Sequence, residues 1–264
     1  MTPKKKVRLV KSRTFVFLTM KDFVRRLLQK TLGYDNYLLA FSILTIKTLR
    51  WRSHEEEFFY FLKIIPDNGI VLDIGANIGV MTVQLARRLP KSQIYSFEPM
   101  PNNIRALKKV IGFYKLTNVK VVESALGDET GEIKMVLPVI NNTKMQGLSH
   151  VVEADNNADW NTGELFTVPV ITLDSMAELQ GNTRITAIKI DVENFEYYVL
   201  KGGVELLKKH KPVIYCELWD NEKRKLSLDL LKSIGYDVKI YNGKKLKDYQ
   251  GESNASNFFL LPRV

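Results

Sequence analysis

One short segment constrains the fold of this chain more than any other: a run of apolar residues that ends in an acid and enters a glycine loop. It reads Val71-Leu72-Asp73-Ile74-Gly75-Ala76-Asn77-Ile78-Gly79. In α/β proteins such a strand leads through a tight loop into a helix, at the sheet edge where these folds bind ligands, and glycines let the backbone approach the ligand. The spacing Gly75-x-Asn77-x-Gly79 lacks the third glycine of the dinucleotide fingerprint. The segment therefore predicts a nucleoside cofactor other than NAD.

Strand-like and helix-like patterns alternate around this segment. Strands are expected at 70–74, 93–97, 119–122, 185–190, 212–218, 236–241 and 257–261, and helices at 79–89, 101–114, 196–209 and 221–234. Strand–helix alternation builds a parallel sheet with helices on both faces. We therefore predict a Rossmann-like α/β fold with a seven-stranded, mostly parallel sheet and a C-terminal antiparallel strand.

The middle of the chain departs from this rhythm. Two further strands are expected at 132–139 and 165–172, and an asparagine-rich polar stretch from Asn141 to Gly163 lies between them. A loop of this length in a compact domain is often a lid or a substrate wall. The alternative interpretation is a surface loop that takes no part in the site.

Acids lie at the ends of the first two predicted strands. Asp73 would repel a pyrophosphate but attract the ammonium and sulfonium groups of S-adenosylmethionine. Glu98, followed by Pro99, could accept both ribose hydroxyls. The alternative is a pair of ordinary strand-end acids beside a tight turn. The cofactor-binding candidates are Asp73, Gly75, Ala76, Asn77, Gly79, Glu98 and Pro99, with Asp191 after the fourth parallel strand.

Several motifs resemble the FkbM family of S-adenosylmethionine-dependent methyltransferases. The resemblance implies a class I methyltransferase fold, S-adenosylmethionine as cofactor, and methylation of a hydroxyl on a sugar, glycan or secondary metabolite. Where the family pattern reads Asp-Val-Glu-Gly, this chain has Asn194, which tolerates left-handed backbone better than most residues. The matching pieces, between about Ser53 and Pro262, are Val71–Gly79, Phe97-Glu98-Pro99, Ala125-Leu126-Gly127-Asp128, Val170–Asp174, Ile188–Glu196 and Leu200-Lys201-Gly202.

Methyl transfer to oxygen also needs a group that takes the hydroxyl proton. Asp191 and Glu193 follow the fourth parallel strand, so one of them could be the base, or two acids there, Glu196 included, could ligate a divalent cation. His150, in the middle insertion, is the other candidate because imidazole titrates near neutral pH. The alternatives are a structural salt bridge for Glu193, a helix cap for Glu196 and a solvated surface position for His150.

Positive charge is concentrated at the N-terminus. Residues 1–52 hold 13 Lys and Arg against Asp22 and Asp35, whereas the rest of the chain holds 26 Lys and Arg against 27 acids. We therefore divide the chain into a basic helical N-terminal extension, 1–52, and a methyltransferase domain, 53–264. This distribution disfavours a nucleic-acid groove across the main domain.

The extension has several interpretations. It could carry a helix packed on the core, or it could lie on an anionic membrane, because Phe23, Leu27, Leu28, Leu32 and the stretch 37–49 alternate with basic residues. The run Pro3–Arg8 resembles a nuclear import signal only superficially.

The lone Cys216 excludes an internal disulfide. We expect a cytoplasmic protein, held at the inner membrane surface if the extension binds lipid.

Two rival functions stay open. The basic N-terminal extension could hold RNA for an RNA-directed methyltransferase. Against this, the chain has no Asp/Asn-Pro-Pro-Tyr/Phe segment for methylating exocyclic amines and no Pro-Cys nucleophile for methylating pyrimidine carbons. A non-catalytic scaffold that retains the fold is the second rival. The expected partner of the main domain is a small-molecule or glycan hydroxyl substrate.

Overall fold

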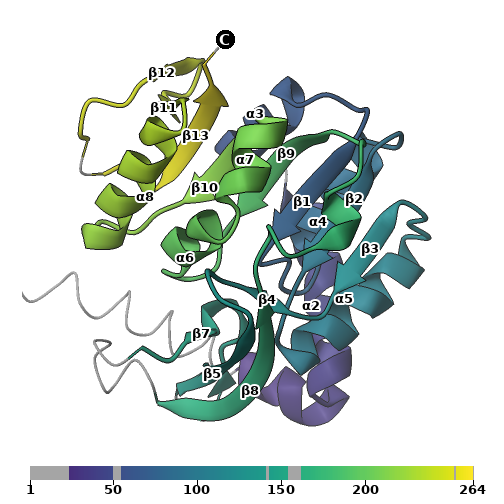
Figure 1. Ribbon diagram of the computed structural model, residues 1–264. Coiled ribbons are helices and arrows are strands. Elements are labelled where there is room, and N and C mark those ends of the chain that lie inside the picture. Colours follow the sequence, from purple (N-terminus) through teal and green to yellow (C-terminus); the bar gives the residue numbers. More distant parts are fainter. Residues whose placement is uncertain (1–23, 50–54, 141–142, 154–161, 253, 264) are drawn as a thin grey trace, which may run out of the picture.

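The computed structural model describes residues 24–49, 55–140, 143–153, 162–252 and 254–263, which form two sheets and the helices around them (Figure 1). The main sheet has eight strands in the order β12-β11-β13-β10-β9-β1-β2-β3. Their bounds are β1 Ile70–Ile74, β2 Gln93–Phe97, β3 Val119–Val122, β9 Ile185–Ile190, β10 Val213–Glu217, β11 Tyr236–Tyr241, β12 Leu246–Asp248 and β13 Asn257–Pro262.

The seven predicted strands all appear in this sheet, and β12 is an eighth. Strands β3, β2, β1, β9 and β10 are parallel to their neighbours, while β13 runs antiparallel between β10 and β11. The extra strand β12 folds back on β11 through a turn in which the Asn242 side chain accepts the backbone N–H groups of Lys244 and Lys245. Strand β12 is only three residues long and mostly polar. It therefore has no apolar run from which a strand could have been predicted.

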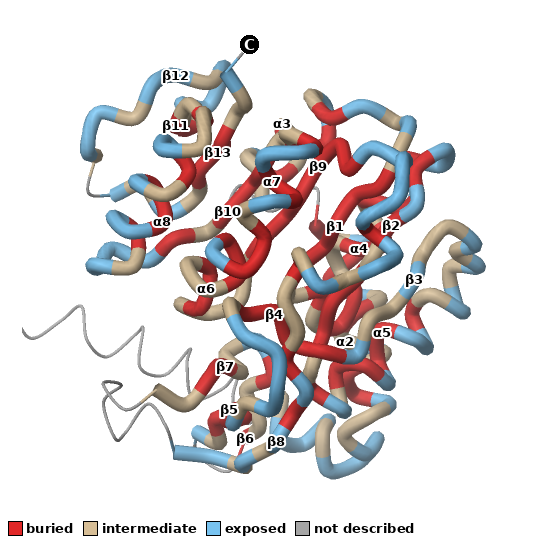
Figure 2. Tube along the Cα trace, viewed as in Figure 1, coloured by how far each residue is buried: buried red, intermediate tan, exposed pale blue. Residues whose placement is uncertain are grey.

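Helices cover both faces of the main sheet, as β1 shows residue by residue. Val71 packs with Phe58 and Phe61 on one face, and Leu72 packs with the cluster that includes Val199 on the other. All five residues of β1 are buried, as Figure 2 shows for the centre of the sheet. The helices are α2 Tyr34–Thr48, α3 Glu56–Ile64, α4 Val80–Arg88, α5 Pro101–Phe113, α6 Glu196–Lys201, α7 Val204–His210 and α8 Glu222–Ser233.

The single helix predicted over 196–209 is wrong, because the structure divides it into α6 and α7 at Gly202 and Gly203. A Cβ atom on Gly202 would lie 1.9 Å from the carbonyl oxygen of Gly127. The break lets the chain pass close to the 127–128 turn, whose Asp128 pairs with Lys201. Helical periodicity continues through the two glycines and therefore could not reveal this contact.

We expect Gly202→Ala to destabilise the protein by about 1–3 kcal/mol, because the added methyl group meets backbone that cannot move aside without cost. Gly112→Ala is the matched control: it lies inside α5, and its Cβ would have no atom within 4 Å. The control should gain about 0.5–1 kcal/mol from helix propensity. Urea unfolding measures both, and equal stability of the two variants would contradict the close-contact explanation.

A second sheet stands beside the carboxyl ends of the main strands. Its strands are β4 Ala125–Leu126, β5 Gly131–Ile140, β6 Thr143–Lys144, β7 His150–Val151 and β8 Gly163–Ile171, with the short 3-10 helix η3 Gln146–Leu148 between β6 and β7. The predicted pair of strands is confirmed as β5 and β8, which run antiparallel. Residues 154–161 of the predicted long loop lie outside the described residues.

Helix α2, within the predicted extension, packs on the core. Tyr37 and Leu38 contact Ile78 and Ala106, while Ile46 lies in a cluster with residues of α4 and α5. These apolar side chains therefore face protein, and the interpretation that 37–49 lies on a membrane is wrong for them. No helix in the described part of the chain is both long enough and apolar enough to cross a bilayer.

Candidate functional site

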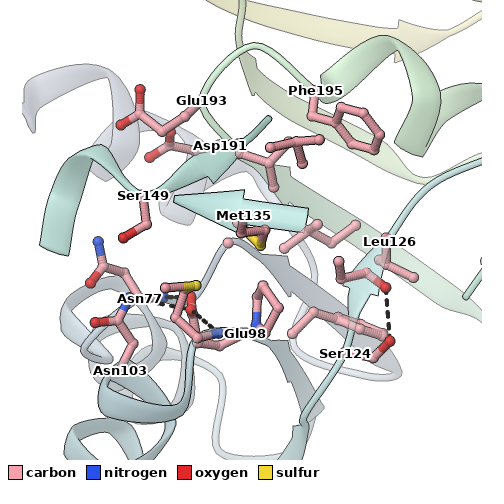
Figure 3. Close-up of a pocket in the computed structure, with 18 of the residues that line it drawn as sticks. Asn77, Glu98, Asn103, Ser124, Leu126, Met135, Ser149, Asp191, Glu193 and Phe195 are labelled. Atoms are coloured by element: carbon pink, nitrogen blue, oxygen red, sulfur yellow. Dashed lines mark hydrogen bonds between the residues drawn. The ribbon is translucent and has the colours of Figure 1, made fainter. Parts of the chain in front are cut away.

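A pocket opens where β1, β2 and β9 end (Figure 3). The main sheet supplies its floor, and the second sheet and η3 supply a wall, so the described part of the predicted loop does line the pocket. The side chains and backbone around it come from Ile74, Gly75, Asn77, Phe97, Glu98, Pro99, Met100, Asn103, Ser124, Ala125, Leu126, Met135, Gln146, Gly147, Ser149, Val151, Asp191, Val192, Glu193 and Phe195.

The sequence predicted that the glycines of the glycine loop let the backbone approach a ligand. In the structure, they make room for close contacts within the protein. Gly75 has a φ of 77°, and a Cβ there would lie 1.9 Å from the carbonyl oxygen of Asp191. A Cβ on Gly79 would lie 2.8 Å from Leu107 Cδ1. Both glycines thus let neighbouring segments of the chain pack closely. Gly75 and Asn77 line the pocket, whereas Ala76 and Gly79 are not among its lining residues.

Glu98 is held at the pocket by three donors. Asn77 N donates to its Oε2 at 2.8 Å, and Met100 N and Asn103 Nδ2 donate to its Oε1 at 2.9 and 3.2 Å. Burial raises the pKa of Glu98 to about 7, although the hydrogen bonds oppose this shift. Pro99 also lines the pocket, so both predicted residues after β2 lie where a ligand can reach them.

Asp73 does not line the pocket, which differs from the predicted direct contact with a cofactor. Its side chain is fully buried, accepts a hydrogen bond from Thr82 Oγ1 at 2.6 Å, and lies 3.7 Å from Lys189 Nζ. Lys189 Nζ also donates to the Gly75 carbonyl at 3.1 Å and lies 3.5 Å from Asp191. Asp73 therefore balances the buried ammonium that ties the glycine loop to the end of β9.

The turn after β9 brings two acids to the pocket, Asp191 and Glu193. Glu193 and Asn194 both have positive φ, 55° and 75°, which confirms that Asn194 adopts left-handed backbone. Asn221 Nδ2 donates to Asn194 Oδ1 at 2.6 Å, a bond that glycine could not make. The carboxylate of Glu196 accepts Val192 N at 3.0 Å, so it closes the turn as a structural group.

Glu193 combines a position at the pocket with a raised pKa. Burial raises its pKa to about 8, and the negative charges of Asp191, Glu217 and Glu196 add to the shift. Burial also raises the pKa of Glu217 to about 7, but Glu217 is not among the pocket-lining residues. The described residues offer no cluster of three or more His, Cys, Asp or Glu side chains arranged for a metal ion.

His150, the other predicted base, is not among the pocket-lining residues. Its neighbours Ser149 and Val151 line the pocket, and because side chains alternate along a strand, His150 faces the other way. The residue is fully buried, and its Nδ1 lies 2.8 Å from the Leu148 carbonyl oxygen. Burial also shows that the alternative of a solvated surface position is wrong for His150.

Several pocket residues were not predicted from the sequence. Asn103 lies one turn into the helix that follows Glu98-Pro99, and Phe195 follows the acidic turn. Both therefore lie next to a predicted motif, and their position in the sequence could have indicated them. Gln146 and Ser149 lie in the stretch predicted as a lid or substrate wall, but no pattern singled them out within it, and Met135 reaches the pocket only through the pairing of β5 with its neighbours.

Fold and site together define the class of protein. A mostly parallel sheet with a glycine loop after β1 and a carboxylate in the pocket after β2 is typical of Rossmann-like proteins that bind a nucleoside cofactor. Residues 73–238 match the family model described as the methyltransferase FkbM domain. This chain belongs to the FkbM methyltransferase family.

Two relatives agree with this family. The chain is 26% identical over 206 residues to methyltransferase sdnD of Sordaria araneosa, covering 68% of this chain and 78% of the relative. It is 28% identical over 159 residues to the 2-O-methyltransferase NoeI of Sinorhizobium fredii (strain NBRC 101917 / NGR234), covering 58% and 64%.

A solved structure shows the same fold. The methyltransferase FkbM from Methylobacillus flagellatus KT superposes with a TM-score of 0.53 at 18% sequence identity. The match covers 93% of this chain and 60% of that chain. The predicted methyltransferase fold is thereby supported, with eight strands in the main sheet instead of seven.

Proposed function

We propose that this protein is an S-adenosylmethionine-dependent O-methyltransferase that acts on a hydroxyl of a sugar, glycan or secondary metabolite. One observation carries the proposal: a single pocket holds Glu98, Asn77 and Asn103 on one side and Asp191 and Glu193 on the other (Figure 3). The first group suits a nucleoside, and the second suits a cationic methyl donor and a hydroxyl proton. The relative named 2-O-methyltransferase supports oxygen as the acceptor atom.

The pocket fits the cofactor on three counts. The Glu98 carboxylate is fixed by backbone and side-chain donors, so it is preorganised to accept ribose hydroxyls. The buried Oδ1 of Asn77 has no hydrogen-bond partner among the described residues, which leaves an acceptor for a ligand donor. Ala125, Leu126 and Met100 add the apolar lining that an adenine ring needs.

The chain's own residues would then position and deprotonate the acceptor. S-adenosylmethionine, when bound, supplies a methyl group activated by its sulfonium. Asp191 places negative charge beside the glycine loop, where it would attract the ammonium or sulfonium group. Glu193 would take the hydroxyl proton, because its raised pKa makes it a stronger base than an ordinary glutamate.

The wall formed by η3 would orient the acceptor and limit water. Gln146 and Ser149 offer polar groups at the pocket, and Met135 and Val151 offer apolar contacts. In-line methyl transfer depends strongly on such orientation. We therefore assign acceptor selection to this wall and cofactor binding to the main sheet.

The proposal is tested by titrating S-adenosylhomocysteine into the protein and by supplying labelled S-adenosylmethionine with a panel of hydroxylated acceptors. We expect binding, and a methyl ether product with at least one sugar, glycan or secondary metabolite. Binding without turnover on any acceptor would favour the scaffold alternative. Turnover on RNA, lost when residues 1–23 are removed and at high salt, would favour the RNA-directed alternative. Absence of binding to the folded protein would overturn the proposal.

A further inference from the structure

The helix of residues 24–32, at the N-terminal end of the described chain, is attached to the pocket wall by one side. Arg25 Nη1 donates to the Met145 sulfur at 3.0 Å. Gln29 Nε2 donates to the Lys144 carbonyl at 3.3 Å, and Lys144 N lies 3.4 Å from Gln29 Oε1. Met145 directly precedes η3, which lines the pocket. The helix is therefore fixed next to the proposed acceptor wall.

The same helix carries four exposed apolar side chains. Val24, Leu27, Leu28 and Leu32 have exposed fractions of 48%, 49%, 40% and 43%. Their spacing of i, i+3, i+4 and i+8 places them together on one side of a helix. Arg25 and Gln29 hold the helix to the wall beside Leu28 and Leu32, and all four apolar side chains nevertheless stay exposed.

The sequence in and before this apolar stripe is basic. Arg26 and Lys30 lie on the same helix and are exposed, and residues 1–23 before it contain seven Lys and Arg against one acid. A stripe of leucines with Lys and Arg on the remaining surface is typical of a helix that lies in the interface of an anionic membrane. An apolar groove on a protein partner would account for the leucines but would not require the concentration of positive charge.

We propose that the helix of residues 24–32 docks on an anionic phospholipid surface, with Val24, Leu27, Leu28 and Leu32 inserted among the lipids. Arg26 and Lys30 of the helix supply attraction to the headgroups. Because Arg25 and Gln29 bond to Met145 and Lys144, docking places the pocket wall close to the membrane. This inference concerns where the protein sits and does not depend on which acceptor it methylates.

The test is cosedimentation of the full chain with phosphatidylcholine vesicles that either contain or lack phosphatidylserine. We expect binding only with phosphatidylserine, and weaker binding at higher salt. The double variant Leu27→Glu, Leu28→Glu should bind at least about tenfold more weakly, because two inserted side chains are replaced by acids. Leu44→Glu is the matched control, since Leu44 is 61% exposed on neighbouring α2 and lies outside the stripe.

A second, milder variant, Leu27→Ser with Leu28→Ser, guards against misfolding, and thermal melting checks that all variants remain folded. Three outcomes would overturn the proposal: wild type that does not bind phosphatidylserine vesicles, stripe variants that bind as wild type does, or a Leu44 variant that loses as much binding. A wild-type dimer that the stripe variants convert to a monomer would also overturn it, because a second copy would then cover the leucines.

Discussion

Glu193→Gln is expected to lower the rate of methyl transfer by about 10²–10⁴-fold, the usual contribution of a general base. Glutamine keeps the shape of the side chain at the pocket but cannot take the hydroxyl proton. Binding of S-adenosylhomocysteine should change little, because Glu98 and Asn77 lie on the other side of the pocket. Single-turnover kinetics with saturating cofactor separates the two effects. A variant that turns over at the wild-type rate would remove Glu193 from the mechanism.

The pH dependence of the rate gives a second signature of Glu193. The base is active only when ionised, so the rate should rise with pH and level off above about 8. Glu217→Gln is the matched control: Glu217 is a neighbouring carboxylate that raises the pKa of Glu193 but does not line the pocket. This control should keep the maximal rate and move the rise to lower pH, because one negative charge near Glu193 is gone.

Stability checks that Glu193→Gln is not simply unfolded. The pKa of Glu193 rises from 4.5 to about 8 on folding, so this carboxyl favours the folded state most below pH 4.5 and loses that effect as the pH rises toward 8. Glutamine stays neutral throughout. Above about pH 8 the variant should therefore melt at the same temperature as the wild type or higher.

Glu98→Gln is expected to weaken binding of S-adenosylhomocysteine by about 1–3 kcal/mol, which is roughly 5–150-fold in Kd. The substitution replaces a charged acceptor by an amide and leaves one of the donors Asn77 N, Met100 N or Asn103 Nδ2 poorly paired. Calorimetric titration measures the change. Glu123→Gln is the matched control, because Glu123 follows β3 nearby but is exposed and pairs with Lys108.

The affinity should also depend on pH through Glu98. Its pKa of about 7 means that the carboxylate protonates below neutral pH and then accepts one hydrogen bond fewer. The wild type should therefore bind S-adenosylhomocysteine more weakly as pH falls through 7, and Glu98→Gln should lose that dependence. Equal affinity of wild type and Glu98→Gln at pH 8 would remove Glu98 from the cofactor site.

Local patterns were sufficient to predict most of the main sheet and both sides of the pocket. Long apolar runs identify buried strands whatever surrounds them, and the carboxyl ends of parallel strands meet at one edge. Strand order and strand ends alone therefore place Glu98, Asp191 and Glu193 together, as the pocket confirms. Asn194 is a similar case, because its tolerance of positive φ is a property of the residue itself.

Tertiary structure decided where the individual side chains point. Asp73 pairs with Lys189 on β9, which is far away in the sequence but is the neighbouring strand of the sheet. Gly202 breaks a regular helical pattern because it meets the backbone of Gly127. His150 does not line the pocket, because the pairing of β7 with β5 determines which side chains of β7 face the pocket. The sequence by itself determined the order of the elements and the edge that carries the site, since these follow from short-range periodicity. Contacts between distant segments determined which groups reach the pocket, since close packing between them depends on atoms that no local pattern specifies.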